Sequence, residues 1–107
     1  MRQPTLNSIL ETIRTINDAY RGKGFRLMGV FGSYARETAD PFIDIDIAYR
    51  IDHDRFHPDD AFAKLEEIET IRKNLERKLR RRVDLVPYPP KNDSPLAQRL
   101  RKELRSA

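Results

Sequence analysis

Cysteine is absent from the 107-residue sequence, which excludes disulfides, thiolate metal sites and cysteine nucleophiles. No apolar run approaches the roughly 18 residues that a membrane-spanning helix needs. The N-terminal residues Met1 to Pro4 lead into a polar segment and lack the apolar stretch of a signal peptide. Internal repeats, low-complexity tracts and interdomain linkers are missing as well. We therefore expect one cytoplasmic domain over residues 1–107, with no membrane association.

The chain is polar and basic. Hydrophobic residues make up 38% and charged residues 36%, and the formal net charge is +4. A positive balance permits an anionic partner but does not choose one. The densest basic run, Lys78 to Arg82, falls at the end of an expected helix, where cations are favoured anyway. We therefore do not expect direct nucleic-acid binding.

Apolar residues recur at helical spacing in three segments. The first covers residues 6–20 and begins either at Ser8, in a capping box with Glu11, or one turn earlier at Thr5. The second is a long helix that opens at Asp59 and Asp60. Its expected apolar stripe consists of Phe62, Leu65, Ile68, Ile71, Leu75 and Leu79. The third is capped by Asp93 or Ser94 and carries Leu96, Leu100 and Leu104. A fourth, short helix is expected over residues 34–38.

Three further segments are predicted to be strands, over residues 25–31, 42–49 and 82–88. In the second, isoleucines alternate with Asp44, Asp46 and Ala48, so the two sets face opposite sides of the sheet. In the third, Val83 and Leu85 alternate with Asp84 and Val86. Residues 50–58 are expected to form a loop. The predicted fold is an α/β (α+β) domain, a small mixed β-sheet of three or more strands packed against helices on one face.

The aspartates are the first candidate site residues. Residues i and i+2 of a strand share a face about 6.5 Å apart, so Asp44 and Asp46 can converge on a hard cation through oxygen ligands. Asp84 joins them if the third strand neighbours the second. Three carboxylates in a basic protein suit two Mg²⁺ ions, a set used in phosphoryl-type transfer. The alternative is a half-exposed strand that carries aspartates on its solvent side.

A second candidate feature precedes the aspartates. Gly32 and Ser33 follow a buried strand, and glycine there permits a sharp turn and close approach of a ligand. Ser33 would begin a short helix, where free N–H groups favour phosphate. Together with the aspartates, this pair predicts a phosphate cradle that faces a metal site.

With these residues the chain resembles a minimal nucleotidyltransferase domain of the DNA-polymerase-β-like superfamily. The family pattern of Gly-Ser, ten residues and Asp-x-Asp matches Gly32-Ser33 and Asp44-Ile45-Asp46, and the longer form adds Ala35 and Arg36. The later third carboxylate matches Asp84. Two positions depart from the pattern: Glu37 replaces a glycine and Ile43 replaces a serine.

The resemblance implies a metal-dependent transfer of a nucleoside monophosphate, AMP from ATP, to a hydroxyl. Asp44 and Asp46 would bind Mg²⁺, with Mn²⁺ as an alternative, Asp84 would help activate the hydroxyl, and Gly32 and Ser33 would contact phosphate. Arg36 would either contact phosphate as well or brace the motif helix through hydrogen bonds. We expect no further acceptor-binding region in this chain, so the acceptor is expected on another protein. Stand-alone domains of this kind are similar to antitoxins that adenylylate a tyrosine of an adjacently encoded HEPN ribonuclease toxin, which implies a hetero-oligomer.

Two alternatives remain open at this point. One is an antitoxin that silences its partner by contact alone, favoured by Glu37 at the motif glycine. The other is a small-molecule nucleotidyltransferase that completes its pocket by self-association. The base preference, the acceptor residue and the stoichiometry are not predicted by the sequence.

Overall fold

A computed structural model describes residues 4–32, 44–89 and 94–107, apart from the side chain of Leu96. The elements in chain order are α1 (Leu6–Ala19), β1 (Phe25–Phe31), β2 (Ile45–Ile51), α2 (Ala61–Leu79), β3 (Val83–Pro87), α3 (Pro95–Glu103) and β4 (Arg105–Ser106). The expected short helix over 34–38 lies outside the described residues. In the part of the chain that is described, no helix is both long enough and apolar enough to span a bilayer.

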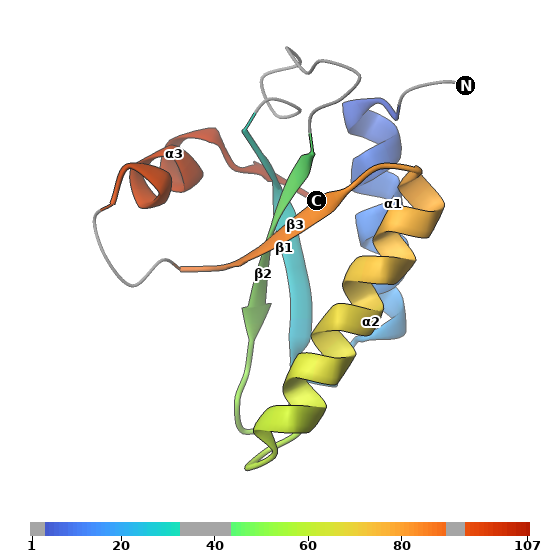
Figure 1. The fold of residues 1–107 in the computed structure, drawn as a ribbon, viewed down its shortest axis with the longest axis vertical. Coiled ribbons are helices and arrows are strands. Elements are labelled where there is room, and N and C mark those ends of the chain that lie inside the picture. Colours follow the sequence, from blue (N-terminus) through green and yellow to red (C-terminus); the bar gives the residue numbers. More distant parts are fainter. Residues whose placement is uncertain (1–3, 33–43, 90–93) are drawn as a thin grey trace.

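The strands form one mixed sheet in the order β3-β2-β1-β4 (Figure 1). β1 runs antiparallel to β2 and to β4, whereas β3 runs parallel to β2. Asp84 was expected to join Asp44 and Asp46 only if its strand lies next to theirs. β2 and β3 are neighbours, so this condition is confirmed. β4 was not expected, because two residues are too few for a periodic signal. It packs tightly on β1: a side chain at Gly29 would overlap the carbonyl oxygen of Arg105.

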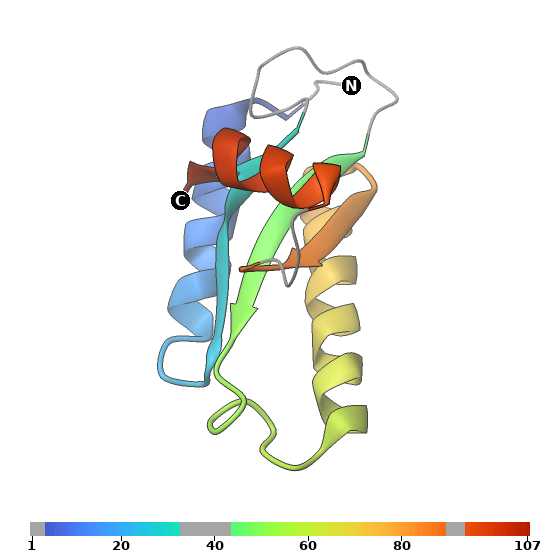
Figure 2. The same cartoon turned by 90° about the vertical axis from the view of Figure 1, so that its left-hand side faces the viewer.

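Helices cover both faces of the sheet, so the expectation of one covered face is wrong. α1 and α2 pack on one face, where the main core gathers Ile9, Ile13, Leu27, Ile45, Ile47, Leu75 and Val83 among others. α3 lies across the opposite face near one end (Figure 2). There Leu100 forms a second small cluster with Phe31 and Ala48. The alternation in β2 is confirmed, because its isoleucines face the main core and Ala48 faces α3.

The helix starts follow side-chain caps. Thr5 caps α1 and exchanges hydrogen bonds with Ser8, so the earlier of the two expected starts is the correct one. Asp60 caps α2 by accepting from the backbone N–H of Ala63. Ser94 caps α3, which begins with Pro95. Each cap satisfies an N–H group that the helix itself leaves unpaired.

Two expectations about α2 and β2 need correction. Phe62 and Leu65 do not belong to the buried stripe of α2, because they are 83% and 66% exposed. At about 1.5 Å per residue this helix is about 28 Å long, whereas β3 has five residues, and its first turns reach past the strand that they would cover (Figure 1). β2 continues to Ile51 instead of ending at Tyr49, because Arg50 and Ile51 pair with the first residues of β1.

Candidate active site

The candidate site lies where β1 ends and β2 and β3 begin. Asp46 of β2 and Asp84 of β3 are direct partners in the parallel ladder. Neighbouring strands lie about 4.8 Å apart, so the two carboxylates start from adjacent points on one face. Asp44 directly precedes β2, and alternation along the chain puts it on the face of Asp46. Asp44 and Asp46 are partly buried and Asp84 is exposed.

The three carboxylates share a face but do not form a ready ligand set. Among the residues that the structure describes, no three acidic or histidine side chains are close enough together to hold a metal ion. Carboxylate oxygens are nevertheless the donors that Mg²⁺ prefers. Since Asp46 and Asp84 start one strand spacing apart, rotation of their side chains suffices to bring their oxygens together.

Gly32 closes the site on the β1 side. It follows the last residue of β1 in a turn with φ +75°, a conformation that favours glycine. A Cβ atom there would lie 2.5 Å from Oδ2 of Asp46. The expected turn is confirmed, and the group that comes close to the glycine is the candidate ligand Asp46. Ser33 and Arg36, and also Glu37, lie outside the described residues.

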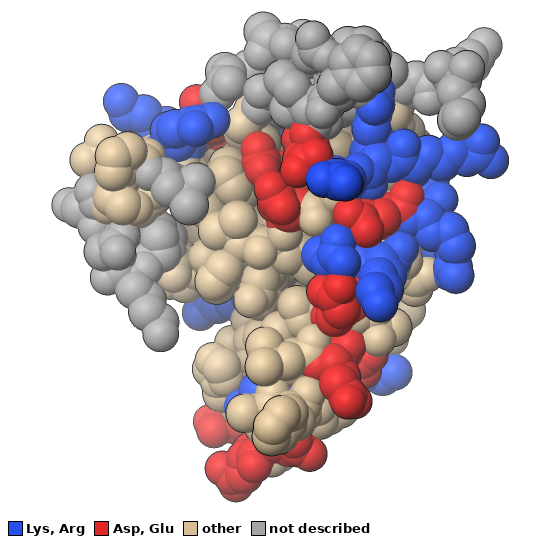
Figure 3. Space-filling view, in the orientation of Figure 1, with Lys and Arg blue, Asp and Glu red and all other residues tan. Residues whose placement is uncertain are grey.

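Acidic and basic side chains lie side by side on this part of the surface. Figure 3 shows a group of acidic side chains over β3 and the adjacent end of β2, with basic ones beside it near the C-terminal end of α2. Lys78 lies in the last turn of α2, Arg80 is its C-cap, and Arg81 and Arg82 connect it to β3. Two carboxylates opposite each other on neighbouring strands repel. The nearby cations offset part of this repulsion through solvent.

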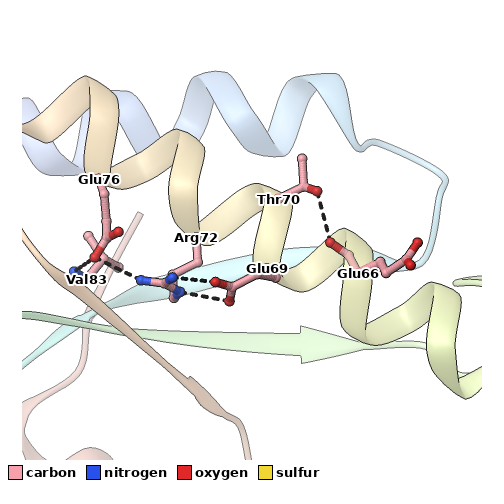
Figure 4. Close-up of polar contacts among 6 residues, drawn as sticks. All are labelled: Glu66, Glu69, Thr70, Arg72, Glu76 and Val83. Carbon is pink, nitrogen blue, oxygen red and sulfur yellow. Dashed lines mark hydrogen bonds and ion pairs between the residues drawn. The ribbon is translucent and has the colours of Figure 1, made fainter.

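A network on α2 holds the start of β3, and the sequence analysis missed it (Figure 4). The carboxylate of Glu76 accepts a 3.0 Å hydrogen bond from the backbone N–H of Val83, the residue before Asp84. Glu76 also forms a 2.9 Å ion pair with Arg72, which donates in turn to Glu69. The hydrogen bond from Arg72 lowers the pKa of the Glu69 carboxyl, and the same bond raises the pKa of Arg72. Helical spacing could have suggested the ion pairs, but not the bond to β3.

The tyrosines near the sheet are structural. Tyr20 and Tyr49 are partly buried and pack against the main core. Burial raises the pKa of both hydroxyls, and for Tyr20 a 3.1 Å hydrogen bond to Glu67 adds to the effect. Both phenols therefore stay protonated at neutral pH.

The comparison with protein families agrees with this geometry. The family described as Nucleotidyltransferase domain matches residues 10–106, a span that includes β1, β2 and β3 with all three aspartates. No individual curated protein matches the sequence. A mixed sheet with an acidic end beside a glycine turn, covered by helices, is consistent with that family's fold. The chain therefore belongs to the nucleotidyltransferase domain family of the polymerase-β-like type.

Proposed function

We propose that this chain transfers AMP from ATP to a hydroxyl of a partner protein, a tyrosine of a HEPN-type toxin, and so acts as an antitoxin. The observation that carries the transferase part is the pairing of Asp46 with Asp84 at one rung of the ladder, on the face that Asp44 shares. Membership of the nucleotidyltransferase family supports the same reaction. The nucleotide, the acceptor and the antitoxin role belong to the proposal.

The proposed roles follow from position. Asp44 and Asp46 would hold Mg²⁺, with Asp84 completing the set, and the bound cations would supply charge stabilisation to the triphosphate. Gly32 and Ser33 would offer backbone N–H groups to the β- and γ-phosphates. The acceptor oxygen attacks the α-phosphorus, the bond from that phosphorus to the oxygen that bridges to the β-phosphate breaks, and pyrophosphate leaves. Asp84, the exposed member, takes the hydroxyl proton and passes it to water.

An apolar patch on α2 favours a protein as the acceptor. The patch consists of Phe62 and Leu65, which are 83% and 66% exposed. Between residues 59 and 69 the chain carries five acidic residues and one lysine, although its net charge is +4. Buried aromatic anchors dominate protein interfaces. The acidic surroundings would repel a second copy of the same patch, so a partner with an apolar site and basic neighbours fits best.

The outer edge of β3 argues that this partner binds through side chains. β3 is the last strand on its side of the sheet, and such an edge can pair with a strand of another chain. Here the N–H of Val83 is already bonded to Glu76, and Pro87 has no N–H to offer. With these donors removed, strand addition is disfavoured, and α2 provides the better contact surface.

Neutralisation by contact alone is the second candidate function. Leu65 precedes the last residue of α2 by 14 positions, so the patch lies about 20 Å along the helix from the end beside Asp84. A partner can therefore bind the patch without any chemistry at the aspartates. The replacement of the motif glycine by Glu37 favours the same alternative.

The product of the adjacent reading frame is the partner that tests the proposal. Co-expression of the two proteins shows whether they co-purify. The partner is also purified alone and incubated with the protein, ATP and Mg²⁺, and its intact mass is measured. We expect an increase of one nucleoside monophosphate on a tyrosine, which the Asp46→Asn/Asp84→Asn variant does not produce. Asp54→Asn, at an exposed loop acid, is the matched control and should act like the wild type.

One combined result separates the candidate functions. An unmodified partner, together with full neutralisation in cells by the double variant, would refute transfer as the biological mechanism. Neutralisation by contact would then be the mechanism.

The role of the α2 patch has its own test. Replacing Phe62 and Leu65 by serine should weaken co-purification of the partner while ATP binding is retained. Retained co-purification would show that this patch does not bind the partner.

A further inference from the structure

A cleft of about 750 Å³ opens at the end of the sheet opposite the aspartates. The C-terminal end of α1, the start of β1 and the end of β2 meet there (Figure 2). Along β2, Arg50 follows Asp46 by four residues, which is about 13 Å of strand. The cleft is therefore separate from the proposed transfer site.

Arginine dominates the lining of this cleft. The lining includes Arg14, Arg21, Arg26, Arg50 and Arg55, together with the carboxylates of Asp18 and Asp52. The two carboxylates are already engaged, Asp18 with Arg21 at 2.9 Å and Asp52 with Arg55 at 3.7 Å. Within the described part of the chain, Arg14, Arg26 and Arg50 form no ion pair or side-chain hydrogen bond. Three guanidinium groups therefore face the cleft uncompensated.

The backbone holds two of these cations directly opposite each other. Arg26 of β1 and Arg50 of β2 are register partners in the antiparallel ladder, and both are exposed. Like charges at such a position destabilise a sheet unless an anion lies between them. A guanidinium group binds phosphate through two parallel N–H bonds, so two of them side by side suit a ligand with more than one phosphate.

We propose that this cleft binds a short chain of phosphates, held between Arg26 and Arg50. Its volume lies within the range of small-molecule sites and holds a ligand of nucleotide size. Nucleic-acid sites usually show a basic patch or stripe, whereas here Asp18 and Asp52 interrupt the positive lining. The ligand source is either an inorganic polyphosphate or the triphosphate of a free nucleotide. Unlike the transfer site, this site needs no divalent cation.

Titration calorimetry of the full chain with inorganic tripolyphosphate, in EDTA, tests the site. We expect binding that the Arg26→Gln/Arg50→Gln variant weakens at least tenfold and that weakens in high salt. Asp46→Asn/Asp84→Asn, which alters only the proposed transfer site, should bind no less tightly than the wild type. Lys73→Gln/Lys102→Gln removes the same charge from exposed helix positions elsewhere and should bind within about twofold of the wild type. Circular dichroism of each variant confirms that it is folded.

A second arm identifies the source of the phosphates. ATP that binds at least tenfold more tightly than tripolyphosphate in EDTA, through the same two arginines, indicates a nucleotide. Equal affinities indicate that the phosphate chain alone is recognised. Absent tripolyphosphate binding, or binding unchanged in Arg26→Gln/Arg50→Gln, would overturn the proposal. So would a single-stranded RNA oligonucleotide that binds through these arginines while tripolyphosphate does not.

Discussion

The carboxylate of Glu76 accepts a hydrogen bond from the backbone N–H of Val83, at 3.0 Å, and thereby ties α2 to the first residue of β3. Val83 is buried in the main core and is followed by Asp84. The bond satisfies an N–H group on the open edge of the sheet, and the ion pair with Arg72 fixes the direction of the carboxylate. Glu76 thus fixes the backbone directly before Asp84, one of the three candidate site carboxylates.

Replacing Glu76 by alanine should destabilise the domain by about 1–3 kcal/mol, because a partly buried N–H group loses its acceptor. Glu76→Gln should cost less, since the amide oxygen still accepts from Val83 while the ion pair with Arg72 is lost. Urea denaturation measures both. Glu66→Ala on the exposed side of α2 is the matched control and should change stability by less than about 0.5 kcal/mol. Equal losses for Glu76→Ala and Glu66→Ala would contradict the role of this bond.

The sequence predicted the sheet where strands were long enough to show their alternation. Ile45 and Ile47 face the main core and Asp46 does not, because a period of two leaves no other choice once one face is apolar. The same reasoning put Asp84 beside Asp46 only on the condition that the two strands are neighbours, which the ladder confirms. The roles of Asp44, Asp46 and Asp84 stay predictions.

The sequence reasoning failed where burial depends on what lies opposite. Phe62 and Leu65 continue the helical spacing of Ile71 and Leu75, but the sheet does not extend far enough to cover them. Periodicity reports which residues share a face and not how far the neighbouring layer reaches. The hydrogen bond between Glu76 and Val83 could not be predicted for a similar reason, because it depends on how α2 packs against the edge of β3.

The exposed patch on α2 should contribute little to the stability of the free protein. We expect Phe62→Ser and Leu65→Ser each to change the free energy of unfolding by less than about 0.5 kcal/mol. Leu75→Ala, at a fully buried position of the same helix, should cost about 2–5 kcal/mol. Thermal and urea unfolding provide the comparison. A large loss at Phe62 or Leu65 would mean that these side chains are buried in the free protein in solution.

The ion pair of Glu69 with Arg72 should stabilise the domain in a pH-dependent way. The hydrogen bond from Arg72 lowers the pKa of Glu69 in the folded state below its ordinary value of 4.5. A lowered pKa contributes stability that is present above this value and is lost as the pH falls through the folded-state pKa. The wild type should therefore be more stable than Glu69→Gln at neutral pH, and the difference should vanish in acid.

Urea midpoints of the two proteins, at neutral pH and well below pH 4.5, measure this effect. Glu66→Gln is the control, because it removes one acid from the same helix without breaking an ion pair to Arg72. A stability difference for Glu69→Gln that stays constant across this range would contradict the assignment.

Gly32 should be required both for its backbone conformation and for the space that it leaves to Asp46. Gly32→Ala places a methyl group 2.5 Å from Oδ2 of Asp46, at a residue whose φ is +75°. Gly22 has a similar φ of +78° but nothing within 4 Å of an added Cβ. Gly22→Ala therefore measures the backbone cost alone, about 1–2 kcal/mol, and Gly32→Ala should cost more by the energy of the clash.

A double-mutant cycle isolates that contact. Asp46→Ala removes the carboxylate, so the combined variant Gly32→Ala/Asp46→Ala should be more stable than the sum of the two single changes predicts. We expect an interaction energy of about 0.5–3 kcal/mol from urea denaturation, the range for residues in contact. The corresponding pair of Gly22→Ala with Asp46→Ala should be additive, because Gly22 lies in the turn before β1, far from Asp46. Additivity of the Gly32 pair would show that the Asp46 side chain rotates away from the added methyl group at negligible cost. In that case Gly32 would be needed for the turn alone.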